Sequence, residues 1–121
     1  MQYMKLINFL AFMSIAVNAL EKILSYIGQR TYPTVIFEGN IFTVPFIRHY
    51  GLEWGHIIPF LLTLLATFGI WLLAKYSVKP LETYPMRKEI AMAIYLFMFS
   101  FLVINTAIVA YQNAYLIWIN S

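Results

Sequence analysis

The sequence contains no cysteine and few charged residues. Without thiols the chain can form no disulfide bond and can supply no cysteine ligand to a metal cluster, so thiol chemistry is excluded. Charged residues make up 11% of the 121 positions, whereas about 25% is usual in soluble domains. The net charge is +3, but the basic residues are scattered and no polar face accompanies them. Nucleic-acid binding is therefore a poor interpretation.

Long apolar segments accompany this low content of charged residues. The chain is 62% hydrophobic, well above the roughly 45–50% of a soluble domain, and this excess suits contact with lipid. We predict an all-α fold in which one membrane domain, residues 1–121, forms an integral bundle of three transmembrane helices with an apolar external loop after the first. The predicted spans are residues 6–28, 52–76 and 90–119. The first span is interpreted as a retained helix, because Asn18, Glu21 and Lys22 lie where a signal-peptide cleavage site would be expected.

Each predicted span carries a stripe of polar residues. Spacings of three, four or seven residues put the members of a stripe on one face of a helix. We expect these faces to turn toward other helices, because hydrocarbon offers polar groups no hydrogen-bond partners. The predicted helix-packing polar residues are Ser14, Asn18, Glu21, Ser25, Thr63, Thr67, Asn105 and Gln112. Thr106 and Asn113 form a second stripe beside the last two residues.

The link at residues 77–89 is the only clearly hydrophilic connection. Four basic residues lie in it or directly before it, namely Lys75, Lys79, Arg87 and Lys88. An excess of lysine and arginine marks the cytoplasmic side of a membrane protein. We therefore predict a multi-pass protein of the cell membrane with this link and the N-terminus in the cytoplasm, and with the first loop and the C-terminus outside.

The predicted first loop, residues 30–50, is rich in apolar residues, and two interpretations of it remain open. In the first, Glu38-Gly39-Asn40 closes a β-hairpin between strands at residues 35–37 and 41–44. In the second, the segment lies along an interface and includes a short helix that starts at Pro45 and ends at Gly51. In either case the loop is too apolar to sit free in water and packs on a membrane surface or another protein.

Both histidines of the chain lie around the start of the second span, His49 before it and His56 in its first turns. His49, Glu53 and His56 are spaced four and three residues apart, and on one continuous helix they would share a face that can hold zinc or iron. Gly51 and Gly55 favour the alternative, a pair of interfacial histidines bonded to backbone or headgroups, because they loosen a ligand set that metal binding needs preorganised. We predict no bound metal and no other cofactor for this chain alone.

Glu21 is the one acidic residue placed well inside a predicted span, since Glu53 stands at the very start of the second. Intramembrane acids are candidates for a proton or cation relay. The alternative is a structural acid near the outer interface, paired with Arg30 or Arg48 or hydrogen-bonded to Asn105 or Gln112. The pattern contains no glycine-rich phosphate loop, and no Ser–His–acid triad can be assembled from it.

Residues 18–76 resemble a family of small uncharacterised bacterial and archaeal membrane proteins with three helices. That family has a polar or acidic residue in its first helix, then an E-x-N-P turn, a short helix, a glycine and a second span. Glu38-Gly39-Asn40 matches E-x-N and Gly51 matches the glycine, whereas Ile41 replaces the proline and His56 stands near a position where the family often has lysine. The resemblance implies a three-helix membrane fold and implies no activity.

These observations predict a non-catalytic accessory subunit of a larger integral membrane complex, such as a respiratory or monooxygenase complex. Its expected partners are the lipid bilayer and larger membrane subunits. One alternative is a small self-assembling transporter or channel that uses Glu21. Another is a membrane protein that binds metal through His49, Glu53 and His56.

Overall fold

The computed structural model describes residues 2–32 and 43–121, and these residues are helical with short connections. The elements are α1 (Gln2–Thr31), α2 (Thr43–Tyr50), α3 (Leu52–Tyr76), the short 3-10 helix η1 (Lys79–Leu81) and α4 (Pro85–Asn120). No strand occurs within the described ranges. The predicted all-α class is therefore confirmed for this part of the chain.

Among the described residues, three segments are long and apolar enough to cross a membrane: α1, the segment Leu52–Leu81 that contains α3 and η1, and α4. The predicted spans at residues 6–28, 52–76 and 90–119 each fall inside one of them. At about 1.5 Å per residue even α3, with its 25 residues, exceeds the ~30 Å of a hydrocarbon core. With 30 and 36 residues, α1 and α4 are longer still.

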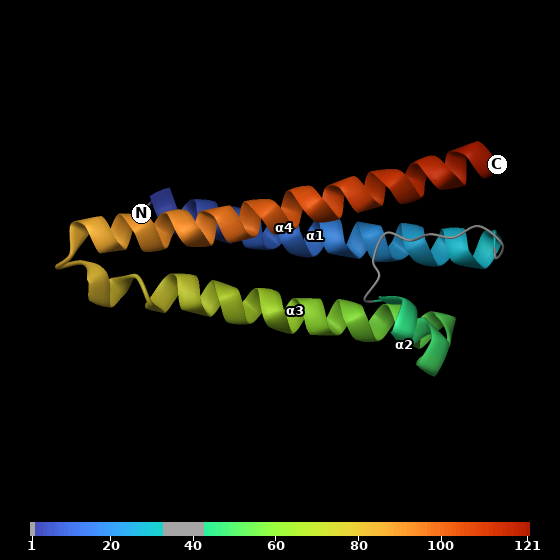
Figure 1. The fold of residues 1–121 in the computed structure, drawn as a ribbon, viewed down its shortest axis with the longest axis horizontal. Helices are drawn as coiled ribbons and strands as arrows, with labels where there is room; N and C mark the ends of the chain where they lie inside the picture. Colours follow the sequence, from blue (N-terminus) through green and yellow to red (C-terminus); the bar gives the residue numbers. More distant parts are fainter. Residues whose placement is uncertain (1, 33–42) are drawn as a thin grey trace.

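Helix α1 is the central element of the bundle (Figure 1). It runs antiparallel to α3 and parallel to α4, and it packs along both, whereas α3 and α4 hardly touch each other. The N-terminal and C-terminal ends of the chain therefore lie toward opposite ends of the bundle. In the most apolar 18-residue stretch of α1, 33% of the residues are buried, whereas in the corresponding stretch of α4 only 6% are buried. Few apolar residues of α4 are thus fully buried, and many of its large side chains are exposed.

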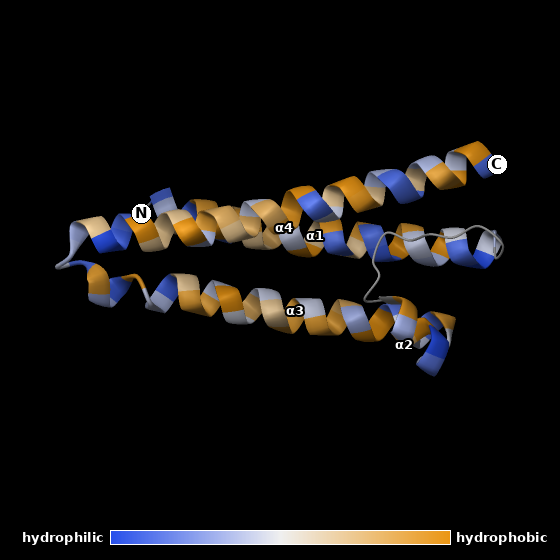
Figure 2. Ribbon diagram, in the orientation of Figure 1, coloured by the Kyte–Doolittle hydropathy of each residue, from blue (hydrophilic) through white to orange (hydrophobic). Residues whose placement is uncertain are grey.

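The buried face of α1 follows from its sequence pattern. Its members alternate at spacings of four and three residues, which keeps them on one side of a helix: Ile7, Ala11, Ser14, Asn18, Glu21, Ser25 and Gly28. The face is apolar near the N-terminus and polar in the second half. In the ribbon of Figure 2, coloured by hydropathy, hydrophobic residues extend along most of α3 and the middle of α4.

The apolar core lies at the end of the bundle that holds the start of α1. Ile7 and Ala11 from α1, Ala74 from α3 and Phe99 from α4 form one buried cluster. Hydrogen bonds between helices surround it. Tyr3 Oη donates to the Ala74 carbonyl at 3.3 Å, and Trp71 Nε1 donates to Asn8 Oδ1 at 2.7 Å. This end is therefore where the three long helices are held in register.

The opposite end carries α2, which packs on the start of α3. Gly51 ends α2 with a φ of +91°, and its N–H donates to the Ile47 carbonyl at 3.0 Å. The predicted short helix before Gly51 is thus present. It begins at Thr43, so Thr43 and Val44 are helical and do not form the second strand of the alternative hairpin. The rest of that hairpin, and the Glu38-Gly39-Asn40 match to the family pattern, lie outside the described residues.

Candidate functional site

His56 is the centre of the polar half of the bundle. It lies in the first turns of α3, faces α1 and is 4% exposed. Its Nδ1 is 2.7 Å from the Leu52 carbonyl oxygen, and because a carbonyl can only accept, Nδ1 carries a proton. Its Nε2 is 3.0 Å from Ser25 Oγ, and in the neutral ring this nitrogen accepts the hydroxyl proton. Both ring nitrogens are engaged, so the imidazole is a fixed bridge between α3 and α1.

A second set of polar contacts covers His56 on the exposed side. The Tyr26 ring meets the imidazole edge to face, with centroids 5.8 Å apart. Tyr26 Oη donates to Glu53 Oε1 at 3.4 Å and accepts from Arg30 Nη1 at 2.9 Å. These hydrogen bonds are exposed, so water competes with them and they contribute little to stability.

Glu21 and Lys22 form a buried ion pair on α1. Lys22 Nζ is 3.2 Å from Glu21 Oε2, and the two side chains are 6% and 3% exposed. The sequence-based alternatives for a structural Glu21 were Arg30, Arg48, Asn105 and Gln112. The structure instead gives it the neighbouring lysine. Removing either partner would leave an uncompensated buried charge, which is costly.

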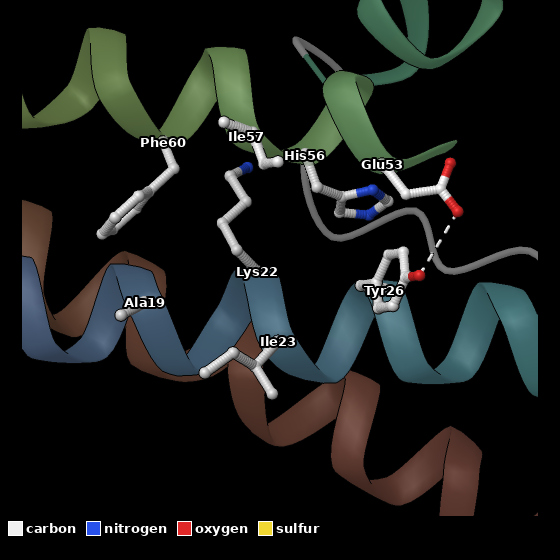
Figure 3. A pocket seen from close by; sticks show the side chains of 8 residues that line it. All are labelled: Ala19, Lys22, Ile23, Tyr26, Glu53, His56, Ile57 and Phe60. Atoms are coloured by element: carbon white, nitrogen blue, oxygen red, sulfur yellow. Dashed lines mark hydrogen bonds between the residues drawn. The ribbon is translucent and has the colours of Figure 1, made fainter. Parts of the chain in front are cut away.

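A pocket of about 430 Å³ lies between α1 and α3 beside this pair (Figure 3). The residues that line it are Ala19, Lys22, Ile23, Tyr26, Glu53, His56, Ile57 and Phe60. The Lys22 side chain extends from α1 toward α3, between Phe60 and His56. The walls are mostly apolar, so the pocket suits an apolar group, with its polar contacts gathered near His56.

The three predicted metal-ligating residues are not brought together. His49 lies on α2, where its ring packs edge-on against Tyr50 at 4.6 Å, whereas Glu53 and His56 lie on α3. The positive φ of Gly51 separates the two helices, so the shared helix face required by the spacing argument does not exist. Within residues 2–32 and 43–121, no group of three His, Asp or Glu side chains could hold a metal ion.

The predicted polar stripes differ in where they lie. The buried members are Ser14, Asn18, Glu21, Ser25 and Thr67, and Thr63 is half-buried. Asn105 and Gln112 are exposed on the outer face of α4. The neighbouring stripe faces inward instead, with Thr106 half-buried and Asn113 only 1% exposed.

Asn113 is a buried amide on α4. Its Oδ1 and Nδ2 have no partner among the described residues, and neither does Asn18 Oδ1. Ile7 and Phe99 share the core cluster of the two parallel helices. Glu21 lies fourteen residues after Ile7, and Asn113 lies fourteen residues after Phe99. Because the two helices are parallel, Asn113 lies at the level of Glu21. The polar interior of the bundle therefore continues from α3 through α1 to α4.

Sequence reasoning missed the Ser25–His56 contact. In the described part of the chain, no acid bonds the other side of this ring, because the His56 Nδ1 partner is the Leu52 carbonyl. The available signal was that Ser25 lies on the predicted stripe of the first span and that His56, seven residues before Thr63, shares the face of the stripe on the second. No family model, no curated protein and no solved structure matches this chain. Its function is therefore argued from its own residues.

Proposed function

We propose that this chain is a multi-pass membrane protein that acts as a non-catalytic accessory subunit and packs through α4 against a larger subunit of a membrane complex. Its three long apolar helices support membrane insertion. The outer surface of α4 supports it as well, because exposed large side chains such as Phe97, Phe101 and Ile104 are stable in hydrocarbon and costly in water.

The main support for packing against a partner subunit is the exposed polar stripe of α4. Asn105 and Gln112 are seven residues apart on its outer face, where lipid cannot hydrogen-bond their amides. A groove of about 290 Å³ runs beside Asn105, with Ser100 as its other polar member and Phe97, Phe101 and Ile104 among its walls. A helix of another subunit that carries hydrogen-bonding side chains would cover both the groove and the amides.

The polar interior supports a structural role for this chain. His56 Nδ1 is bonded to the Leu52 carbonyl within α3, and Nε2 is bonded to Ser25 of α1, so the ring is held in place by both nitrogens. The Glu21 carboxylate is paired with Lys22 within the same helix. A proton relay needs further titratable groups at successive depths. The buried residues that follow this pair toward the core are amides, hydroxyls and apolar side chains.

Mild detergent extraction of the tagged chain, followed by mass spectrometry of co-purifying proteins, tests the proposal. The test variant is Asn105→Leu/Gln112→Leu. The matched control is Ala107→Leu/Ala114→Leu, which has the same spacing and new residues on another exposed part of α4. Hydrogen bonds between membrane helices contribute about 0.6 kcal/mol each on average. We therefore expect the test variant to hold its partner about tenfold more weakly and the control to hold it normally.

Three results would overturn this function. The first is a wild-type chain that purifies alone under conditions that preserve known membrane complexes. The second is a test variant that keeps its partner as well as the control does. The third is proton flux through liposomes that contain the purified chain and its loss in Glu21→Gln. That outcome would establish the transporter alternative.

A further inference from the structure

The end of the bundle opposite α2 carries a polar pocket that the proposed assembly does not use. It has a volume of about 620 Å³ and takes its lining from the start of α1, the end of α3, η1 and the start of α4. All three long helices thus contribute to one concave site. The tryptophan and tyrosine side chains near it, including Trp71 and the exposed Tyr76 and Tyr84, are the residue types found at a membrane–water interface.

The charge in this pocket is mainly positive. Lys75, Lys79 and Lys88 line it, with Glu82 as the only acid. Within residues 2–32 and 43–121, no acid forms an ion pair with Lys79 or Lys88. Lys75 Nζ lies over the Trp71 and Tyr76 rings, with distances of 5.1 and 5.3 Å to their centroids. The rings hold this cation at the rim without neutralising it, so the site keeps an excess of two positive charges.

Apolar side chains form the other wall of the pocket. Met4 from α1 and Val78, which is 6% exposed, lie beside the lysines. A ligand that fills the pocket therefore needs an anionic group for the lysines and an apolar part for this wall. Both features occur together in an anionic phospholipid, whose phosphate lies at the depth of the interfacial aromatics while its acyl chains continue along the helices.

We propose that this pocket binds the headgroup of an anionic phospholipid. The inference rests on the membrane location proposed above and is independent of any partner subunit. The bound group is a phosphate diester held by Lys79 and Lys88, with Lys75 at the rim. The Glu82 carboxylate repels anions and so limits the negative charge that the site accepts. A free phosphate ion shares the charge but lacks the apolar part, so the site favours the lipid.

The test uses the purified full chain in bilayers of mixed phosphatidylglycerol and phosphatidylcholine, followed by native mass spectrometry of retained lipid. The test variant is Lys79→Gln/Lys88→Gln. The control is Lys5→Gln/Arg87→Gln, which removes the same charge from exposed positions near the same end of the bundle but outside the pocket lining. One lysine near an anionic surface changes affinity about fivefold, so two lysines change it roughly thirtyfold.

We expect the wild type and the control to retain phosphatidylglycerol and the test variant to lose this retention about thirtyfold. Equal loss in both variants would show a diffuse surface charge and overturn the site. Equal retention of phosphatidylcholine, or displacement of lipid by inorganic phosphate at the same concentration, would also overturn it. Flotation of the chain with liposomes after an alkaline wash is measured separately. Failure of that step would refute the membrane location and with it both proposals.

Discussion

At Gly55 the start of α3 lies directly against the backbone of α2, and a single methyl group there should be destabilising. A Cβ atom on Gly55 would overlap the backbone of Ile47 and lie 2.7 Å from its nitrogen. A backbone yields less easily than the end of a flexible side chain. We predict that Gly55→Ala displaces α2 from α3 and lowers the free energy of unfolding.

The magnitude follows from two opposing terms. Overpacking of a close contact costs about 1–3 kcal/mol, and the higher helix propensity of alanine returns about 1 kcal/mol. The net effect of Gly55→Ala is a loss of up to about 2 kcal/mol. Gly69, in the same helix, is a matched control because no atom lies within 4 Å of its added Cβ. Only the propensity term applies there, and Gly69→Ala should gain up to about 1 kcal/mol.

Both variants can be compared by reversible denaturant titration in detergent micelles, followed by helical circular dichroism. Hydrogen exchange of the Gly51 amide, which donates to the Ile47 carbonyl at 3.0 Å, reports on the local contact. We expect faster exchange in Gly55→Ala and unchanged exchange in Gly69→Ala. A Gly55→Ala protein as stable as Gly69→Ala would refute the reasoning from close packing.

Three further predictions concern the polar cluster and the topology. Ser25→Ala leaves His56 Nε2 without its buried partner and should cost about 1–3 kcal/mol in the same titration; an unchanged midpoint would mean that the Ser25–His56 bond does not stabilise the fold. Tyr26→Phe removes only exposed hydrogen bonds and should change stability by no more than about 0.5 kcal/mol, so a loss as large as that of Ser25→Ala would contradict the burial argument. The chain has no cysteine, so Thr83→Cys and Ser121→Cys can each be labelled with an impermeant maleimide. We expect labelling of Ser121→Cys in intact cells and of Thr83→Cys only after lysis, and the reverse pattern would invert the predicted topology.

The sequence by itself determined where the long helices lie. Its apolar runs exceed twenty residues. In lipid such a run forms a helix, because a helix satisfies the hydrogen bonds of its backbone N–H and C=O groups within its own segment. The three predicted spans accordingly fall inside α1, α3 and α4. Gly51 also marked the end of the short helix before α3, because only glycine adopts a positive φ without steric cost. The inward face of α1 followed from its alternating spacings of four and three residues.

Only the tertiary structure decided which polar residues meet. Two polar stripes lie side by side on α4, and a pattern cannot say how far a helix rotates about its axis. Packing against α1 turns Asn113 inward and leaves Asn105 exposed. His49 and His56 have a spacing that fits a metal site on one helix, but the backbone turn at Gly51 places them on different helices. Ser25 and His56 are 31 positions apart in the chain. Their hydrogen bond depends on the register of α1 against α3, which is set by side-chain contacts at the far end of the bundle.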